Sequence, residues 1–178
     1  MKLPWLLAAL AFGMCGVMVA TLILDKPDNA AGVVHPTYAP MRHGGAGVER
    51  HGGAPFVVGT IYGVLIIGML VGLMALGARK AGRLSPRTIA AFSIGFLLHV
   101  GVFLTMMISY RAYMQGGARP QFLALPLPTA WMIYGLWAAP VFFIVLYATA
   151  FDRWTYTDAD RARFAELLAA RADRESAR

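Results

Sequence analysis

Four histidines are the residues of this chain whose type and spacing best suit metal or cofactor chemistry. His99 lies near the middle of a long apolar stretch, whereas His35, His43 and His51 recur every eight residues in a glycine-rich segment. An ionisable side chain deep among apolar residues is a functional candidate, because it needs a polar partner there. His99 is therefore a candidate haem ligand, quinone hydrogen-bond donor or proton carrier. The plainer alternative is a neutral histidine bonded to a carbonyl or hydroxyl on a neighbouring helix.

The three spaced histidines suggest a Cu or Zn site. Two of them head a short repeat, Arg-His-Gly-Gly-Ala, at 42–46 and 50–54, and Met41 offers a soft sulfur ligand. Imidazole nitrogen is a ligand for both metals. A spacing of eight fits neither a pair one helical turn apart nor a zinc knuckle, so two alternatives stay open. The segment is then a flexible loop that packs on a partner, or it contacts anions or lipid headgroups.

The elements that position these histidines are apolar. Four stretches of the chain contain no Asp, Glu, Lys or Arg, namely 5–24, 56–78, 88–110 and 129–151. Each is long enough to cross a bilayer core of about 30 Å at about 1.5 Å per residue. Hydrophobic residues make up 58% of the chain and charged residues only 14%, which is too apolar for a soluble domain. We predict an all-α, polytopic membrane protein, with a four-transmembrane-helix bundle over 1–151 and a Gly/His-rich outer loop at 25–54.

Basic residues flank these stretches and indicate an orientation. Of the 16 Lys and Arg residues, 11 fall on the side that would hold both termini and 5 on the other side. The positive-inside rule then places both termini on the cytoplasmic side of the membrane. We expect that membrane to be a bacterial-type inner membrane. The basic segment at 79–87 suits anionic lipids on that side better than a substrate. Nucleic acid is not an expected partner, because the charges form no continuous stripe.

The segment at 152–178 carries a further helix signal. Thr157 with Asp160 three residues later resembles a capping box, and an apolar stripe follows among charged residues, made of Phe164, Leu167 and Leu168. We predict a short cytoplasmic amphipathic helix. Such a helix lies on the inner leaflet or docks on a partner subunit.

Glycines in the second stretch suggest close helix packing. They follow one another at spacings of 4, 5, 4 and 5 residues: Gly59, Gly63, Gly68, Gly72 and Gly77. At about 100° per residue the first, second and fifth share one face, while the third and fourth lie roughly opposite. We expect neighbours to approach this helix closely from two sides.

Pro140 lies at mid-depth in the fourth stretch. Its ring removes one backbone donor and clashes with the carbonyl of Leu136. We predict a kink there, which occurs both in gated transporters and in static bundles.

Motifs for enzyme chemistry are missing. The spans hold no Ser-His-Asp arrangement, and the chain has no H-E-x-x-H, no phosphate-binding Gly-rich loop and no C-x-x-C. Cys15 is the only cysteine, so no intrachain disulfide forms. A self-sufficient transporter normally needs intramembrane acids or bases, or broken helices in repeated halves. We expect a non-catalytic subunit that packs against something larger.

Residues 87–164 add a resemblance to a known family. Leu-Pro-Leu-Pro at 125–128 precedes Trp131, and Phe-Asp-Arg at 151–153 opens a charged tail. With one helix on each side of the outer loop, this half resembles the small two-span accessory subunits of sodium:solute symporters; the first hairpin departs from that pattern. The resemblance implies a larger integral membrane partner of the solute-transporter class, and it transfers no catalytic residue.

Two further hypotheses compete with that one. His99 and the histidine-rich loop favour an accessory subunit of a respiratory or photosynthetic electron-transfer complex, contributing to a haem, quinone or metal site. The glycine faces of the second stretch favour a channel or sensor formed by self-association. The residues themselves require no cofactor under any of the three hypotheses.

Overall fold

The computed structural model describes residues 3–25, 30–79, 83–116, 119–154 and 156–176 and confirms an all-α fold with four candidate membrane spans. The spans are α1 (Leu3–Ile23), α3 (Ala54–Gly77), α4 (Pro86–Met114) and a composite segment, Leu127–Trp154. The third span extends four residues beyond its predicted end at 110. It takes in Arg111, whose guanidinium lies 5.8 Å from the ring centre of Phe56 at the start of α3.

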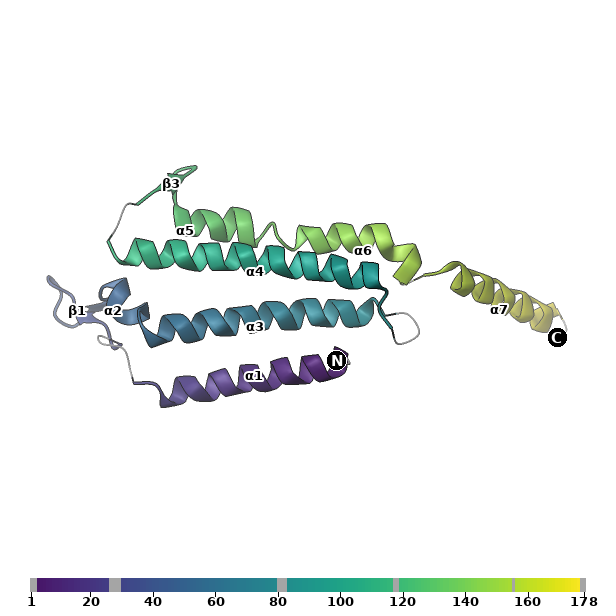
Figure 1. The fold of residues 1–178 in the computed structure, drawn as a ribbon, viewed down its shortest axis with the longest axis horizontal. Coiled ribbons are helices and arrows are strands. Elements are labelled where there is room, and N and C mark those ends of the chain that lie inside the picture. Colours follow the sequence, from purple (N-terminus) through teal and green to yellow (C-terminus); the bar gives the residue numbers. More distant parts are fainter. Residues whose placement is uncertain (1–2, 26–29, 80–82, 117–118, 155, 177–178) are drawn as a thin grey trace.

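The spans lie side by side in chain order, with α3 between α1 and α4 and the fourth span against α4 (Figure 1). The start of α1 and the start of α7 lie at the same end of the bundle. The short connection between α3 and α4 explains why these two spans are antiparallel neighbours. Consequently α1 contributes no buried residue, and its sides away from α3 are open.

A core forms where α3, α4 and α6 (Val141–Trp154) meet, near the end that holds α7. It is centred on Ile67, Val71, Phe92 and Phe143. The ring of Phe92 stacks 6.0 Å from that of Phe143. Lipid is as apolar as these side chains, so close packing and hydrogen bonding hold the spans together more than removal from water.

The fourth span is broken in its middle. It begins as α5 (Leu127–Ala130), continues as the π-helical turn η1 (Trp131–Leu136), passes through a turn at 137–140 and becomes regular α-helix only at α6. Pro140 explains the break, because it has no N–H for the carbonyl of Leu136. The Val141 N–H donates instead to Ala138, three residues back.

Two small hairpins cover the end of the bundle opposite α7 (Figure 1). In the first outer loop β1 (Val33–Val34) pairs antiparallel with β2 (Arg42–His43), and α2 (Gly47–His51) follows. In the second, β3 (Gln121–Phe122) pairs with β4 (Leu125–Pro126). The first outer loop thus contains a short hairpin that the sequence analysis did not predict.

Helix α7 (Asp158–Ser176) extends away from the bundle (Figure 1). Asp160 accepts hydrogen bonds from the Thr157 N–H at 3.0 Å and from its hydroxyl at 2.6 Å, which anchors the first turn. Arg161 joins this turn to the end of α6 through an ion pair of 2.7 Å with Asp152. A helix therefore forms where the sequence predicts one, with the predicted pairing of Thr157 and Asp160 at its start.

Candidate functional site

His99 projects from α4 toward the fourth span. Two residues on the same face of α4, Gly95 and Val102, contact the fourth span and fix this direction. A Cβ atom added at Gly95 would lie 2.6 Å from Cζ of Phe143. A methyl group of Val102 would lie 2.7 Å from a Cβ atom added at Gly135. His99 falls between the two contacts along α4. In an antiparallel pair it is then level with the turn at 137–140, where the fourth span is broken.

The imidazole of His99 is buried, with 5% of the residue exposed. Its Nδ1 atom has no hydrogen-bond partner among the described residues. An unpaired polar atom in such a place costs about 1–3 kcal/mol. The neighbouring break leaves a backbone carbonyl without its helical donor in the same layer of the bundle, because Pro140 has no N–H to donate to the carbonyl of Leu136. One unsatisfied side chain therefore lies level with a backbone carbonyl that lacks its usual donor.

This arrangement has limited chemical scope. Nδ1 of His99 can donate one hydrogen bond or accept one, as a quinone oxygen, a water molecule or a freed carbonyl would require. A haem with two histidine ligands would need another histidine from a partner chain, since the other three histidines lie outside the spans. Among the described residues of the four spans, the only acid is Asp152 at the end of α6, so none lies at the depth of His99 to form a general acid–base pair. His99 thus remains a candidate contact for a cofactor.

The structure brings two of the three outer histidines together. The ring centres of His35 and His43 lie 5.8 Å apart in an edge-on arrangement. His51 lies at the end of α2, beyond that hairpin. Among the described residues, no group of three or more His, Cys, Asp or Glu side chains is placed to hold a metal ion. The predicted Cu or Zn site at 35, 43 and 51 is thus reduced to one histidine pair.

Hydrogen bonds give the paired histidines a structural role that their spacing did not indicate. Nδ1 of His35 accepts from the backbone N–H groups of Thr37 and Tyr38, at 3.1 and 3.2 Å. These bonds place the ring proton on Nε2, so neither nitrogen of His35 offers a metal a free lone pair while the turn is intact. Only Nε2 of His43 could do so, since its Nδ1 lies 3.0 Å from the carbonyl of Gly44.

Two of the α3 glycines lie against α1. A Cβ atom added at Gly68 would lie 3.5 Å from a methyl group of Leu10, and one added at Gly72 would lie 2.7 Å from a methyl group of Leu7. Because Gly68 and Gly72 have no side chains, the N-terminal half of α1 approaches α3 closely.

The other three glycines of the predicted set, Gly59, Gly63 and Gly77, have different surroundings. Gly63 lies against the ring of Phe103 on α4, where an added Cβ atom would be 2.8 Å from Cε1. Gly77 lies near the hydroxyl of Tyr147 on α6, at 3.4 Å. No described atom comes within 4 Å of the position for a Cβ at Gly59. The face that carries Gly59 is open at its outer end.

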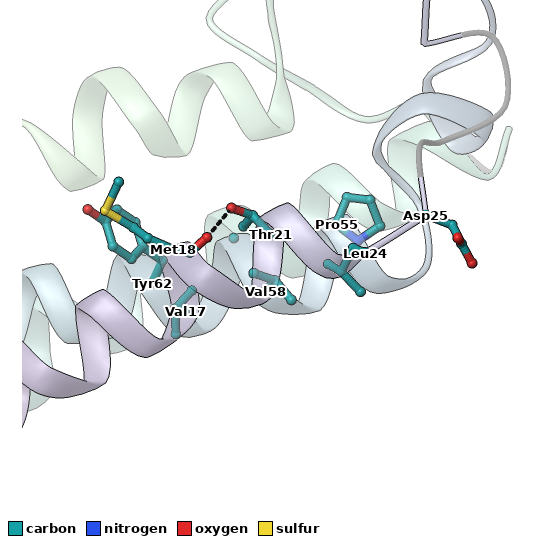
Figure 2. A pocket seen from close by; sticks show the side chains of 9 residues that line it. Val17, Met18, Thr21, Leu24, Asp25, Pro55, Val58 and Tyr62 are labelled. Carbon is teal, nitrogen blue, oxygen red and sulfur yellow. Dashed lines mark hydrogen bonds between the residues drawn. The ribbon is translucent and has the colours of Figure 1, made fainter.

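An apolar groove of about 430 Å³ lies at that open position, between the outer halves of α1 and α3 (Figure 2). Its walls include Val17 and Met18 from α1 and Val58 and Tyr62 from α3. Asp25, just after α1, lies at one end of the groove and points away from the other lining side chains in Figure 2. The groove therefore offers apolar contact area with one carboxylate at its rim.

One contact that holds the spans together was not apparent in the sequence. The hydroxyl of Tyr147 on α6 donates to the backbone carbonyl of Met74 on α3. Tyr147 looks like an ordinary apolar position in the fourth stretch, because its partner is 73 residues away in the chain and is a backbone atom.

No protein-family model, curated protein or solved structure matches this chain.

Proposed function

We propose that this chain is a non-catalytic integral membrane accessory subunit that packs against and stabilises a larger membrane complex. A single observation carries the proposal. Helix α7 exposes Phe164, Leu167 and Leu168 at 54%, 62% and 51%, outside the spans. Lipid tails explain exposed apolar side chains along a span, whereas beyond the span the apolar stripe of α7 needs either the headgroup region of the membrane or a partner surface, and we propose the partner surface.

The bundle gives secondary support to this proposal. Only 17% or less of each span is buried within the chain itself, and α1 buries nothing. The groove beside Gly59 lies between the C-terminal half of α1 and the N-terminal part of α3. These surfaces suit contact with further transmembrane helices, which approach most closely where small residues lie.

The orientation in the membrane is part of the proposal. Both termini are cytoplasmic, because 11 of the 16 Lys and Arg residues lie on their side, and the membrane is a bacterial-type inner membrane. The arginines of α7 then face anionic lipids or an acidic partner surface at the cytoplasmic side. The larger partner is a solute transporter, as the resemblance of residues 87–164 to symporter subunits implies.

The alternative function is an accessory subunit of an electron-transfer complex. The unpaired Nδ1 of His99 favours it, since such an atom suits a quinone oxygen or a haem supplied by a partner. The middle of the described spans holds no Asp, Glu, Lys or Arg and no second His, which weighs against an independent redox role.

The stripe on α7 provides the test. Phe164→Ser with Leu167→Ser and Leu168→Ser should leave the bundle folded, because the three side chains are exposed. The same variant should reduce the mass of the complex isolated in mild detergent to that of the subunit alone. A matched control, Ala162→Ser with Ala165→Ser and Ala169→Ser, changes the same helix but leaves the stripe intact. An unchanged complex in the stripe variant would refute the role of α7 in assembly.

A further inference from the structure

A second groove lies at the other end of the bundle, between the start of α4 and the end of α6. Its volume is about 910 Å³, within the upper range of ligand-binding pockets. Three arginines line it, namely Arg83, Arg87 and Arg153. Its walls between the two helices are apolar and include Leu146 and Ala150.

Acidic side chains do not neutralise these arginines in the part of the chain that the structure describes. There, no Asp or Glu lines the groove, and none of the ion pairs involves these three arginines. Asp152 is the nearest acid in the sequence, next to Arg153. Its carboxylate is bound by Arg161 at 2.7 Å. Three like charges at one groove repel one another and favour an anionic occupant.

The position of the groove suits the membrane surface. Arg87 lies in the first turn of α4 and Arg153 in the last turn of α6, so both mark the ends of spans. Trp154 also lines the groove, and an indole there is typical of the headgroup region. The hydroxyls of Ser85 and Thr88, which are 2.8 Å apart, add hydrogen-bonding groups at the same level.

We propose that this groove is a binding site for an anionic phospholipid. The lipid phosphate lies among the arginines, whose guanidinium groups bind phosphate oxygens in pairs. The first part of an acyl chain lies along the apolar wall of Leu146 and Ala150. A free phosphate would leave that wall uncovered, and a zwitterionic lipid would leave the three positive charges less fully compensated. The inference does not depend on the accessory role.

Native mass spectrometry of the full chain in detergent tests the proposal. Titration with phosphatidylglycerol should show binding at least about tenfold tighter than with phosphatidylcholine of the same acyl chains. Inorganic phosphate at the same concentration should not displace the bound lipid. Equal binding of the two lipids, or displacement by inorganic phosphate, would overturn the proposal.

Paired variants locate the site. Arg87→Gln with Arg153→Gln should weaken phosphatidylglycerol binding by about thirtyfold, since each arginine contributes separately. The control, Arg163→Gln with Arg174→Gln, removes the same charge from exposed positions of α7 and should leave binding unchanged. An equal loss in the control would show a general charge effect and refute the site. If the first pair does not fold, Arg153→Gln alone should weaken binding about fivefold, and unchanged binding there would equally refute it.

Discussion

Gly95 on α4 and Phe143 on α6 are packed so closely that a Cβ atom at Gly95 would lie 2.6 Å from the phenyl Cζ. Phe143 is itself 2% exposed and belongs to the core. The contact sets the distance between the third and fourth spans just inside the break at 137–140. It also fixes the face on which His99 lies, one turn further along α4.

Substitution of Gly95 tests that contact. Gly95→Ala should lower the free energy of unfolding by about 1–3 kcal/mol, because the ring of Phe143 is too well packed to move without strain. Gly101→Ala on the same helix should have no destabilising effect, since no described atom lies within 4 Å of its added Cβ. Thermal unfolding in detergent, followed by circular dichroism, measures both. Equal behaviour of the two variants would contradict the packing described for this pair of spans.

Substitutions at two glycines of α3 distinguish a folding defect from an assembly defect. Gly63→Leu should prevent normal folding, because its side chain would overlap the ring of Phe103. Gly59→Leu should fold normally and fill the groove between α1 and α3, since its Cβ position is open. Under the proposed function, Gly59→Leu weakens association with the larger complex. Size-exclusion chromatography distinguishes a misfolded subunit from a folded one that has lost its partner.

Substitution of His99 by an apolar residue should increase stability, whereas most polar-to-apolar substitutions inside a bundle decrease it. His99→Leu should raise the free energy of unfolding of the isolated subunit by about 1 kcal/mol, because it removes an unpaired polar atom. Thr88→Val serves as the control. It should lower stability by about 1 kcal/mol, since the Thr88 hydroxyl lies 2.8 Å from that of Ser85. A loss of stability in His99→Leu would show that the imidazole has a partner.

The turn between β3 and β4 is strained and can be improved. Leu123 and Ala124 have φ angles of 49° and 62°, a region that glycine and asparagine occupy more easily. Leu123→Asn with Ala124→Gly should therefore raise stability by about 1–2 kcal/mol. Ala112→Gly in α4 is the matched control, and it should lower stability by about 1 kcal/mol. Chemical or thermal unfolding compares the three proteins, and a destabilised turn variant would disprove the strain.

The sequence predicts the spans well because membrane crossing depends on local composition. The charge-free stretches correspond to α1, α3, α4 and the fourth span to within a few residues at their ends. The capped start of α7 also depends on residues close together in the chain, Thr157 and Asp160. The helices themselves can therefore be predicted from residues that are close together in the chain.

The arrangement of the spans depends on contacts that local rules do not contain. The glycine spacing indicates two close faces on α3 but does not tell which neighbour lies on each, or that Gly59 faces a groove. The bond from Tyr147 to the carbonyl of Met74 joins residues 73 positions apart. The hairpin at His35 arises from a side chain that accepts backbone N–H groups, a role that its histidine spacing did not suggest.

Isolation of the chain at its native level in mild detergent tests the accessory role. Mass spectrometry of what co-purifies is combined with a visible absorption spectrum of the same sample. An accessory subunit of a transporter should co-purify in a stoichiometric complex with a larger membrane protein, and the sample should be colourless. Haem-bearing partners with a Soret band would favour the electron-transfer alternative. A colourless subunit that runs alone would contradict the accessory role altogether.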